Sequence, residues 1–271
     1  MKLIPYLSIL ILTIIVLSCA EKKQEETMAG IVTEEVDYES NGTTLKGFLA
    51  YDGDIQGKRP GVLIVHEWWG HNDYARKRAK MIAELGYTAL AVDMYGDGKQ
   101  ANHPDDAGKF AMEVFNNMDL SKAKFEAAME VLKMQPTTDP ERIAAIGYCF
   151  GGGVVLQMAR FGLDLDAVIS FHGALQTAKP AEAGKVIAKL LVCNGEADPL
   201  TTPEQIDAFK KEMSEAGVDY KFINYPGAMH SFTNPIADSV GKKFNMPLAY
   251  NREADEKSWA EMKALLNEVF K

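Results

Sequence analysis

Residues 142–153 read Arg-Ile-Ala-Ala-Ile-Gly-Tyr-Cys-Phe-Gly-Gly-Gly, and this stretch decides the predicted fold. Its apolar start is typical of a buried strand, and a helix is expected at about Val154–Arg160. Between them stands Gly147-x-Cys149-x-Gly151, where glycine permits a sharp strand-to-helix turn that larger side chains would obstruct. The spacing is that of a nucleophile elbow with cysteine as nucleophile, although a glycine-rich turn with an incidental cysteine is the alternative.

Strand and helix patterns alternate on both sides of this turn, which favours one α/β domain over residues 31–271. An antiparallel hairpin is expected around Asn41-Gly42, a dipeptide that tolerates positive φ at both turn positions. We predict a mostly parallel central sheet with helices on both faces. Further strands are expected at 61–65, 88–92, 167–171, 190–194 and 221–225, with helices at about 74–85, within 107–133 and at 252–270.

Two polar side chains follow later strands in an order that suits nucleophilic catalysis. Asp198 comes after the strand near Cys193, and His230 comes after the next strand. Hydrolases with a nucleophile elbow place the nucleophile, the acid and the histidine in this order. His230 would take the proton of the Cys149 thiol, and Asp198 would orient the imidazole. The alternatives are a surface-loop histidine and an aspartate that serves only a turn before proline.

The composition excludes some classes of partner. The chain has 271 residues, a formal net charge of -9 and no run rich in Lys or Arg, which argues against nucleic acid as a ligand. His66 and His172 form no metal-ligand spacing with cysteine or acidic residues, so we expect no metal and no cofactor. They are interpreted as residues that support the site or bond to loop backbone.

The amino-terminal segment resembles an export signal. Lys2 precedes the almost wholly apolar Leu3–Leu17, and Ser18-Cys19 follows directly. The run that ends in Cys19 resembles a bacterial lipobox, which predicts a signal peptide (1–18), lipidation of Cys19 and a flexible tether (19–30). The chain is therefore expected to be an exported bacterial lipoprotein, membrane-anchored on the periplasmic or extracellular side. A plain cleaved signal peptide is the alternative.

Five motifs together resemble the dienelactone hydrolase family of the α/β-hydrolase superfamily. They are His-Glu-Trp-Trp-Gly (66–70), Gly-Tyr-Cys-Phe-Gly-Gly (147–152), Phe-His-Gly (171–173), Gly-Glu-x-Asp (195–198) and Gly-x-x-His-Ser-Phe (227–232). The resemblance implies an α/β-hydrolase fold and cleavage of a small-molecule ester or lactone through a thioester on Cys149. It also implies that Glu67 contacts and activates the resting thiol, and the alternative is a carboxylate at a strand end with no catalytic role. Backbone N–H groups of Trp68 and Phe150 would form the oxyanion hole.

Two positions depart from the family pattern. Dienelactone-cleaving members carry two arginines that hold the substrate carboxylate, and this chain has Asp97 and Asn234 at those positions. Because an anion at position 97 would repel a carboxylate, we expect a substrate other than dienelactone. Lys99 or His103 could compensate, although both suit solvated loop positions.

Aromatic residues near the predicted strand ends are candidates for the substrate pocket. These are Trp68, Trp69, Tyr95 and Phe171, and the alternative is that they cover the core. Two functions of other classes also stay open. One is a noncatalytic lipoprotein that binds a ligand or partner on the same scaffold. The other is a thiol redox protein that uses Cys149, although no second cysteine lies near it in sequence. A disulfide between Cys149 and Cys193 is not expected, because Cys193 sits in an apolar run typical of a buried strand.

Overall fold

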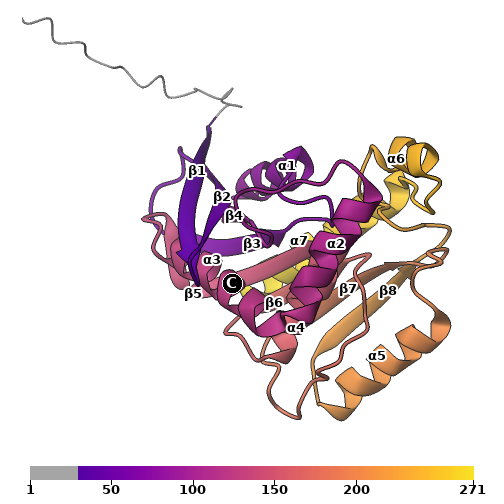
Figure 1. Ribbon diagram of the computed structural model, residues 1–271. Coiled ribbons are helices and arrows are strands. Elements are labelled where there is room, and N and C mark those ends of the chain that lie inside the picture. Colours follow the sequence, from indigo (N-terminus) through magenta and orange to yellow (C-terminus); the bar gives the residue numbers. More distant parts are fainter. Residues whose placement is uncertain (1–29) are drawn as a thin grey trace, which may run out of the picture.

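A computed structural model describes residues 30–271, which form one sheet flanked by helices (Figure 1). The strands are β1 (Ile31–Ser40), β2 (Thr43–Asp52), β3 (Arg59–Val65), β4 (Thr88–Val92), β5 (Thr138–Tyr148), β6 (Ala167–Phe171), β7 (Lys189–Gly195) and β8 (Tyr220–Tyr225). The helices are α1 (Asp73–Ala83), α2 (Pro104–Asn116), α3 (Met118–Lys133), α4 (Phe150–Arg160), α5 (Pro203–Glu215), α6 (Ala237–Phe244) and α7 (Arg252–Val269). The predicted signal peptide, lipidated Cys19 and nearly all of the tether lie outside the described residues and stay predictions.

The strand order confirms the predicted mostly parallel sheet. Within residues 30–271 the order is β1-β2-β4-β3-β5-β6-β7-β8, and every neighbouring pair from β4 to β8 is parallel. The two antiparallel pairs of the described strands lie at the other end of the sheet, where β1 pairs with β2 and β2 pairs with β4. The hairpin closes at Ser40 and Thr43, and Asn41 (φ 49°) and Gly42 (φ 73°) have the positive φ expected of this dipeptide.

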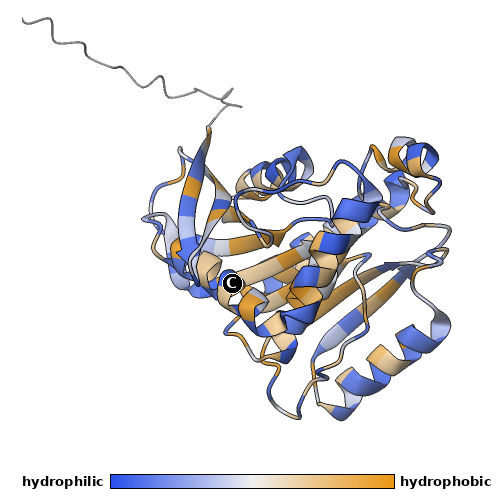
Figure 2. Ribbon diagram, in the orientation of Figure 1, coloured by the Kyte–Doolittle hydropathy of each residue, from blue (hydrophilic) through white to orange (hydrophobic). Residues whose placement is uncertain are grey.

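Each face of the sheet has its own hydrophobic core. Side chains alternate along a strand, so Leu63 and Val65 of β3 point to one core and Val62 and Ile64 to the other. Helices α2 to α5 contribute to the first core, and α1 and α7 to the second. Figure 2 shows that the central strands are mainly hydrophobic, whereas the helices combine hydrophobic and polar residues. The predicted arrangement of helices on both faces is confirmed.

The turn between β5 and α4 is closely packed. Cys149 lies at its apex with φ 54° and ψ −115°, a conformation that an L-residue adopts only with strain. A Cβ atom on Gly147 would lie 2.0 Å from the carbonyl oxygen of Gly151, and one on Gly151 would lie 2.4 Å from that of Val65. Glycine therefore lets α4 begin directly against the carboxyl end of β3.

The two elements that flank the turn at Cys149 each begin four residues earlier than the sequence predicted. Helix α4 begins at Phe150 rather than near Val154, because the close approach to β3 fixes Gly151–Gly153 as helix despite the low helix propensity of glycine. Strand β5 begins at Thr138 rather than Arg142. It passes Pro140 through a register shift opposite Pro60 and Gly61.

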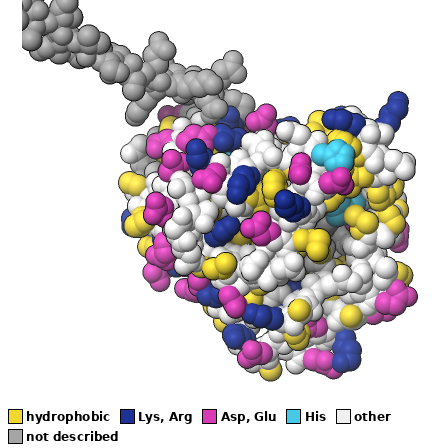
Figure 3. All heavy atoms as spheres, viewed as in Figure 1, with side chains coloured by type: hydrophobic (Ala, Val, Ile, Leu, Met, Phe, Trp, Pro, Cys, Tyr) yellow, Lys and Arg dark blue, Asp and Glu magenta, His cyan; other side chains and the backbone are white. Residues whose placement is uncertain are grey.

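The surface of the described part shows no membrane-spanning element. Within residues 30–271, no helix is long and apolar enough to cross a bilayer. Acidic and basic side chains are interspersed on the face drawn in Figure 3, so that face carries no large basic patch. The apolar segment that suggested membrane attachment lies outside the described residues.

The substitution Gly147→Ala tests the packing of the turn. We expect it to lower the free energy of unfolding by about 3 kcal/mol, because the new methyl group would meet the backbone of Gly151, which cannot move without shifting α4. Urea unfolding followed by circular dichroism measures the change. Gly108→Ala in α2 is the matched control, since its Cβ would meet only the Trp68 ring at 3.9 Å. Equal unfolding midpoints for both variants and the wild type would contradict this explanation.

Candidate active site

Four predicted site residues lie at one edge of the sheet. Glu67, Cys149, Asp198 and His230 follow β3, β5, β7 and β8, respectively. These strands are parallel, so their carboxyl ends meet at the same edge, which is where ligands bind in open α/β sheets. Residues up to 163 positions apart in sequence are thus brought together by topology, as Glu67 and His230 illustrate.

Cys149, His230 and Asp198 form a continuous chain of contacts. The Cys149 Sγ lies 3.0 Å from His230 Nε2, and His230 Nδ1 lies 2.7 Å from Asp198 Oδ2. The other oxygen of Asp198 accepts a hydrogen bond of 2.8 Å from the backbone N–H of Leu200. The imidazole and the carboxylate are buried, whereas Cys149 is half-buried and reachable from solvent. The carboxylate therefore fixes the ring with its second nitrogen facing the sulfur.

The surroundings of His230 favour its charged form. Burial alone would lower the pKa of the imidazole. The charge of Cys149, hydrogen bonds with Asp198 and Cys149, and the charge of Asp198 outweigh burial and raise the pKa to about 10. At neutral pH this arrangement favours the imidazolium form of His230 beside the Cys149 sulfur.

Two backbone N–H groups at the same edge of the sheet as Cys149 have no protein acceptor within the described residues. Within residues 30–271, the N–H groups of Trp68 and Phe150 donate no hydrogen bond, whereas the next one, from Gly151, donates to the carbonyl oxygen of His66 at 3.1 Å. The carbonyl of Trp68 accepts a hydrogen bond of 2.9 Å from the Tyr95 hydroxyl, which helps to fix that peptide. Both free N–H groups are the ones that the family resemblance assigns to an oxyanion hole.

Glu67 makes different contacts from those that the resemblance implies. It is buried, and its two oxygens accept hydrogen bonds from Ser231 Oγ (3.0 Å) and Asn234 Nδ2 (2.7 Å). Within the described residues its hydrogen bonds do not include Cys149, whose side-chain partner is His230. Burial raises the pKa of Glu67 despite these hydrogen bonds. Asn234, at one of the arginine positions of the family, thus holds this carboxyl group.

His172 holds the backbone of the nucleophile. The N–H of Cys149 donates to the carbonyl oxygen of Phe171 at 2.9 Å and to His172 Nδ1 at 3.1 Å. The other ring nitrogen of His172 lies 2.8 Å from Thr233 Oγ1. Burial, with the charges of His230 and Arg78, keeps the pKa of His172 well below its ordinary range. The ring is therefore neutral and able to accept the Cys149 N–H.

A buried arginine that the sequence interpretation missed supports the same loop. Arg78 of α1 donates to the carbonyl oxygen of Thr233 (2.6 Å) and to Asp255 of α7 (2.8 Å). Its Nε donates to the Tyr74 hydroxyl at 3.1 Å, and that hydroxyl lies 2.7 Å from Thr233 Oγ1. The loop that carries His230 is thereby tied to α1, α7 and, through His172, to the turn at Cys149.

The four predicted pocket residues fall into two groups. Trp68 and Trp69 are half-buried, with ring centroids 5.1 Å apart, and stay candidates for substrate contact. Tyr95 is buried and its ring lies 5.3 Å from that of Phe150, whereas Phe171 is 1% exposed and stacks on Tyr148 at 4.9 Å. The structure therefore places Phe171 within the core, because a strand buried on both faces directs its ring under α7 rather than outward.

The other residues considered from sequence have mainly local contacts. Asp97, Lys99 and His103 are exposed, and the backbone N–H of Asp97 donates to Thr44, while His103 caps α2.

The pKa of His66 is lowered to about 4, chiefly by burial. Within residues 30–271 no three His, Cys, Asp or Glu side chains gather in a way that could hold a metal ion. Cys193 is buried, and it and Cys149 are both free thiols.

Comparisons with known proteins identify a family for this chain. A family model described as the dienelactone hydrolase family matches residues 45–270. The chain is 31% identical to Protein usf of Aquifex pyrophilus over 210 residues, which cover 76% of this chain and 89% of the relative. A putative carboxymethylenebutenolidase of Aquifex aeolicus is 29% identical with the same coverage. The crystal structure of a dienelactone hydrolase-like promiscuous phosphotriesterase from metagenomic libraries is 35% identical, with a TM-score of 0.83 and coverage of 89% of this chain and 100% of that chain. From the extent of these matches we conclude that the chain belongs to the dienelactone hydrolase family.

Proposed function

We propose that the chain hydrolyses its substrate through a thioester on Cys149, with His230 and Asp198 completing a catalytic triad. Cleavage of an ester or lactone bond follows from the family, and the mechanism is our inference. The observation that carries it is the unbroken line of contacts, 3.0 Å from sulfur to imidazole and 2.7 Å from imidazole to carboxylate. Nucleophile, base and orienting group within hydrogen-bond reach are the arrangement that covalent acyl transfer requires.

In the first half-reaction, the Cys149 thiolate attacks the carbonyl carbon of the substrate. The negative charge that develops on the carbonyl oxygen faces the free N–H groups of Trp68 and Phe150. The tetrahedral intermediate then collapses, the carbon–oxygen bond to the alcohol breaks, and the imidazolium of His230 gives that oxygen its Nε2 proton. The acyl group remains on sulfur as a thioester, and in a lactone the alcohol remains attached to it.

In the second half-reaction, neutral His230 takes a proton from water as the water oxygen attacks the thioester carbonyl. Collapse of this intermediate breaks the carbon–sulfur bond and releases the carboxylic acid, and the thiolate and imidazolium are restored. Asp198 stabilises the imidazolium in both halves. Glu67 takes no proton in this scheme, and its hydrogen bonds to Ser231 and Asn234 position the loop that carries His230.

The substrate we propose is not a carboxylated dienelactone. The two positions where dienelactone-cleaving relatives carry arginine hold Asp97, which is exposed, and Asn234, whose amide already binds Glu67. Neither side chain offers a cation to a substrate carboxylate. An uncharged ester or lactone fits this arrangement better.

Acylation of Cys149 is the direct test of the mechanism. Brief exposure to p-nitrophenyl acetate followed by an acid quench is expected to leave an acetyl group on Cys149, detected by peptide mass spectrometry. Cys149→Ala is expected to lower kcat/KM for this ester on the order of 1,000-fold or more, because no nucleophile remains. Cys193→Ala, which removes a buried thiol that takes no part in the proposed chemistry, is the control and should retain activity. Unchanged hydrolysis by Cys149→Ala would refute the proposed nucleophile.

The pKa of His230 provides a second test, independent of turnover. Because the charge of Cys149 is the foremost influence that raises this pKa to about 10, Cys149→Ser should lower it, since a serine hydroxyl stays neutral. The imidazolium, present below the pKa, would then be lost at a lower pH than in the wild type. Titration of the ring nitrogens by nuclear magnetic resonance measures the midpoint, with Cys193→Ala as reference. The same midpoint in Cys149→Ser and wild type would show that no thiolate faces His230.

A further inference from the structure

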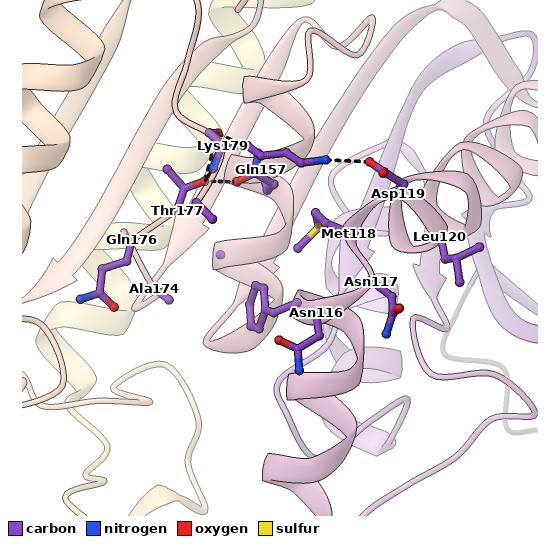
Figure 4. A pocket seen from close by; sticks show the side chains of 13 residues that line it. Asn116, Asn117, Met118, Asp119, Leu120, Gln157, Ala174, Gln176, Thr177 and Lys179 are labelled. Atoms are coloured by element: carbon purple, nitrogen blue, oxygen red, sulfur yellow. Dashed lines mark hydrogen bonds and ion pairs between the residues drawn. The ribbon is translucent and has the colours of Figure 1, made fainter.

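A groove begins one helical turn beyond Cys149. It lies between the α2–α3 junction, the side of α4 that carries Gly153 and Gln157, and the segment 174–179 that follows β6 (Figure 4). Its volume is about 850 Å³, which lies within the usual range for small-molecule sites. The groove is lined by residues from three separate parts of the chain, and none of them belongs to the triad.

Gly153 and Gln157 of α4 line the groove, and they lie one and two helical turns beyond Cys149, the N-cap residue of that helix. On the opposite wall, the Phe115 ring lies 5.4 Å from that of Phe150, the residue after the nucleophile. A Cβ on Gly153 would lie 3.3 Å from the Ala174 Cβ and 3.4 Å from the Phe115 ring, so glycine keeps this end of the groove open.

The lining offers apolar surface and neutral hydrogen-bonding groups. Phe115 (39% exposed) and Leu120 (52% exposed) are large hydrophobic side chains left partly in solvent. Amides and a hydroxyl accompany them, from Asn116, Asn117, Gln157, Gln176 and Thr177. The two charged lining residues, Lys179 and Asp119, bind each other at 2.8 Å, as Figure 4 shows. The groove thus has no free cation for a carboxylate, and its apolar surface is available to an uncharged group.

We propose that this groove binds an uncharged, largely apolar substituent of the ester substrate while the carbonyl carbon lies at Cys149. The inference rests on the proposed thioester mechanism and adds where the substrate extends and what chemistry it carries there. Burial of each methylene of such a substituent strengthens binding, which favours longer chains over acetyl-sized ones. The substituent belongs to the acyl part or to the alcohol part, and two series of esters distinguish these sources.

The test compares chain-length preference between variants. The acyl series is p-nitrophenyl acetate and octanoate, and the alcohol series is ethyl and octyl acetate. A third substrate, the p-nitrophenyl monoester of octanedioic acid, adds a carboxylate at the chain end. Ala174→Trp places a large ring in the groove, and Ala183→Trp places the same ring on an exposed loop outside it. Thermal melting verifies that both variants fold.

We expect the wild type to favour the longer member of one series by about tenfold in kcat/KM, and to lose this preference with the charged chain end. Ala174→Trp should abolish the preference, whereas Ala183→Trp should keep it. If neither series responds to Ala174→Trp while acetate hydrolysis still requires Cys149, the groove does not bind substrate and the proposed function stands. If acetate hydrolysis does not require Cys149, the proposed function and this inference both fail.

Discussion

The close approach of α4 to the carboxyl end of β3 is the constraint on which the site depends. A Cβ atom on Gly147 would lie 2.0 Å from a backbone oxygen, and a Cβ atom on Gly151 would lie 2.4 Å from another. This contact forces the chain to reverse within one residue, which gives Cys149 its positive φ. The same reversal turns the sulfur out of the sheet and leaves the Phe150 N–H without a partner at the start of α4. Strain at position 149 is therefore linked both to the outward direction of the sulfur and to the free N–H of Phe150.

The second half of the site is held by buried polar contacts. His230 lies on a loop, and a loop positions a side chain well only when its backbone is fixed. Here the residues after it are tied to two parts of the chain. Glu67, which follows β3, binds Ser231 and Asn234, and Arg78 of α1 binds the carbonyl of Thr233. The guanidinium also lies over three aromatic rings, 5.2 to 5.3 Å from their centroids, and the ring faces attract the cation. Loss of the Glu67 or the Arg78 side chain would leave its buried hydrogen-bond partners in this network unpaired.

Local patterns in the sequence were enough to predict the sheet and the strands that Cys149, Asp198 and His230 follow. The run at 61–65 and the glycines around Cys149 each carry their own signal, and α5, which was not assigned a range, has a recognisable capping box at Thr202 and Gln205. Contacts between side chains far apart in the chain could not be predicted from these local patterns. Arg78 lies among other basic residues of α1, and nothing in its spacing distinguishes the one that is buried. The role of Asn234 toward Glu67 depends likewise on two loops that meet only in the folded chain.

The central claim is that one tight turn presents the Cys149 sulfur to His230 and to two free backbone N–H groups at once. A crystal structure of the protein acylated on Cys149 tests this most directly. The account predicts a thioester whose carbonyl oxygen lies about 3 Å from the N–H nitrogens of both Trp68 and Phe150, with the His230 ring beside the sulfur. A thioester oxygen that faces solvent, or a Cys149 side chain directed away from His230, would contradict it.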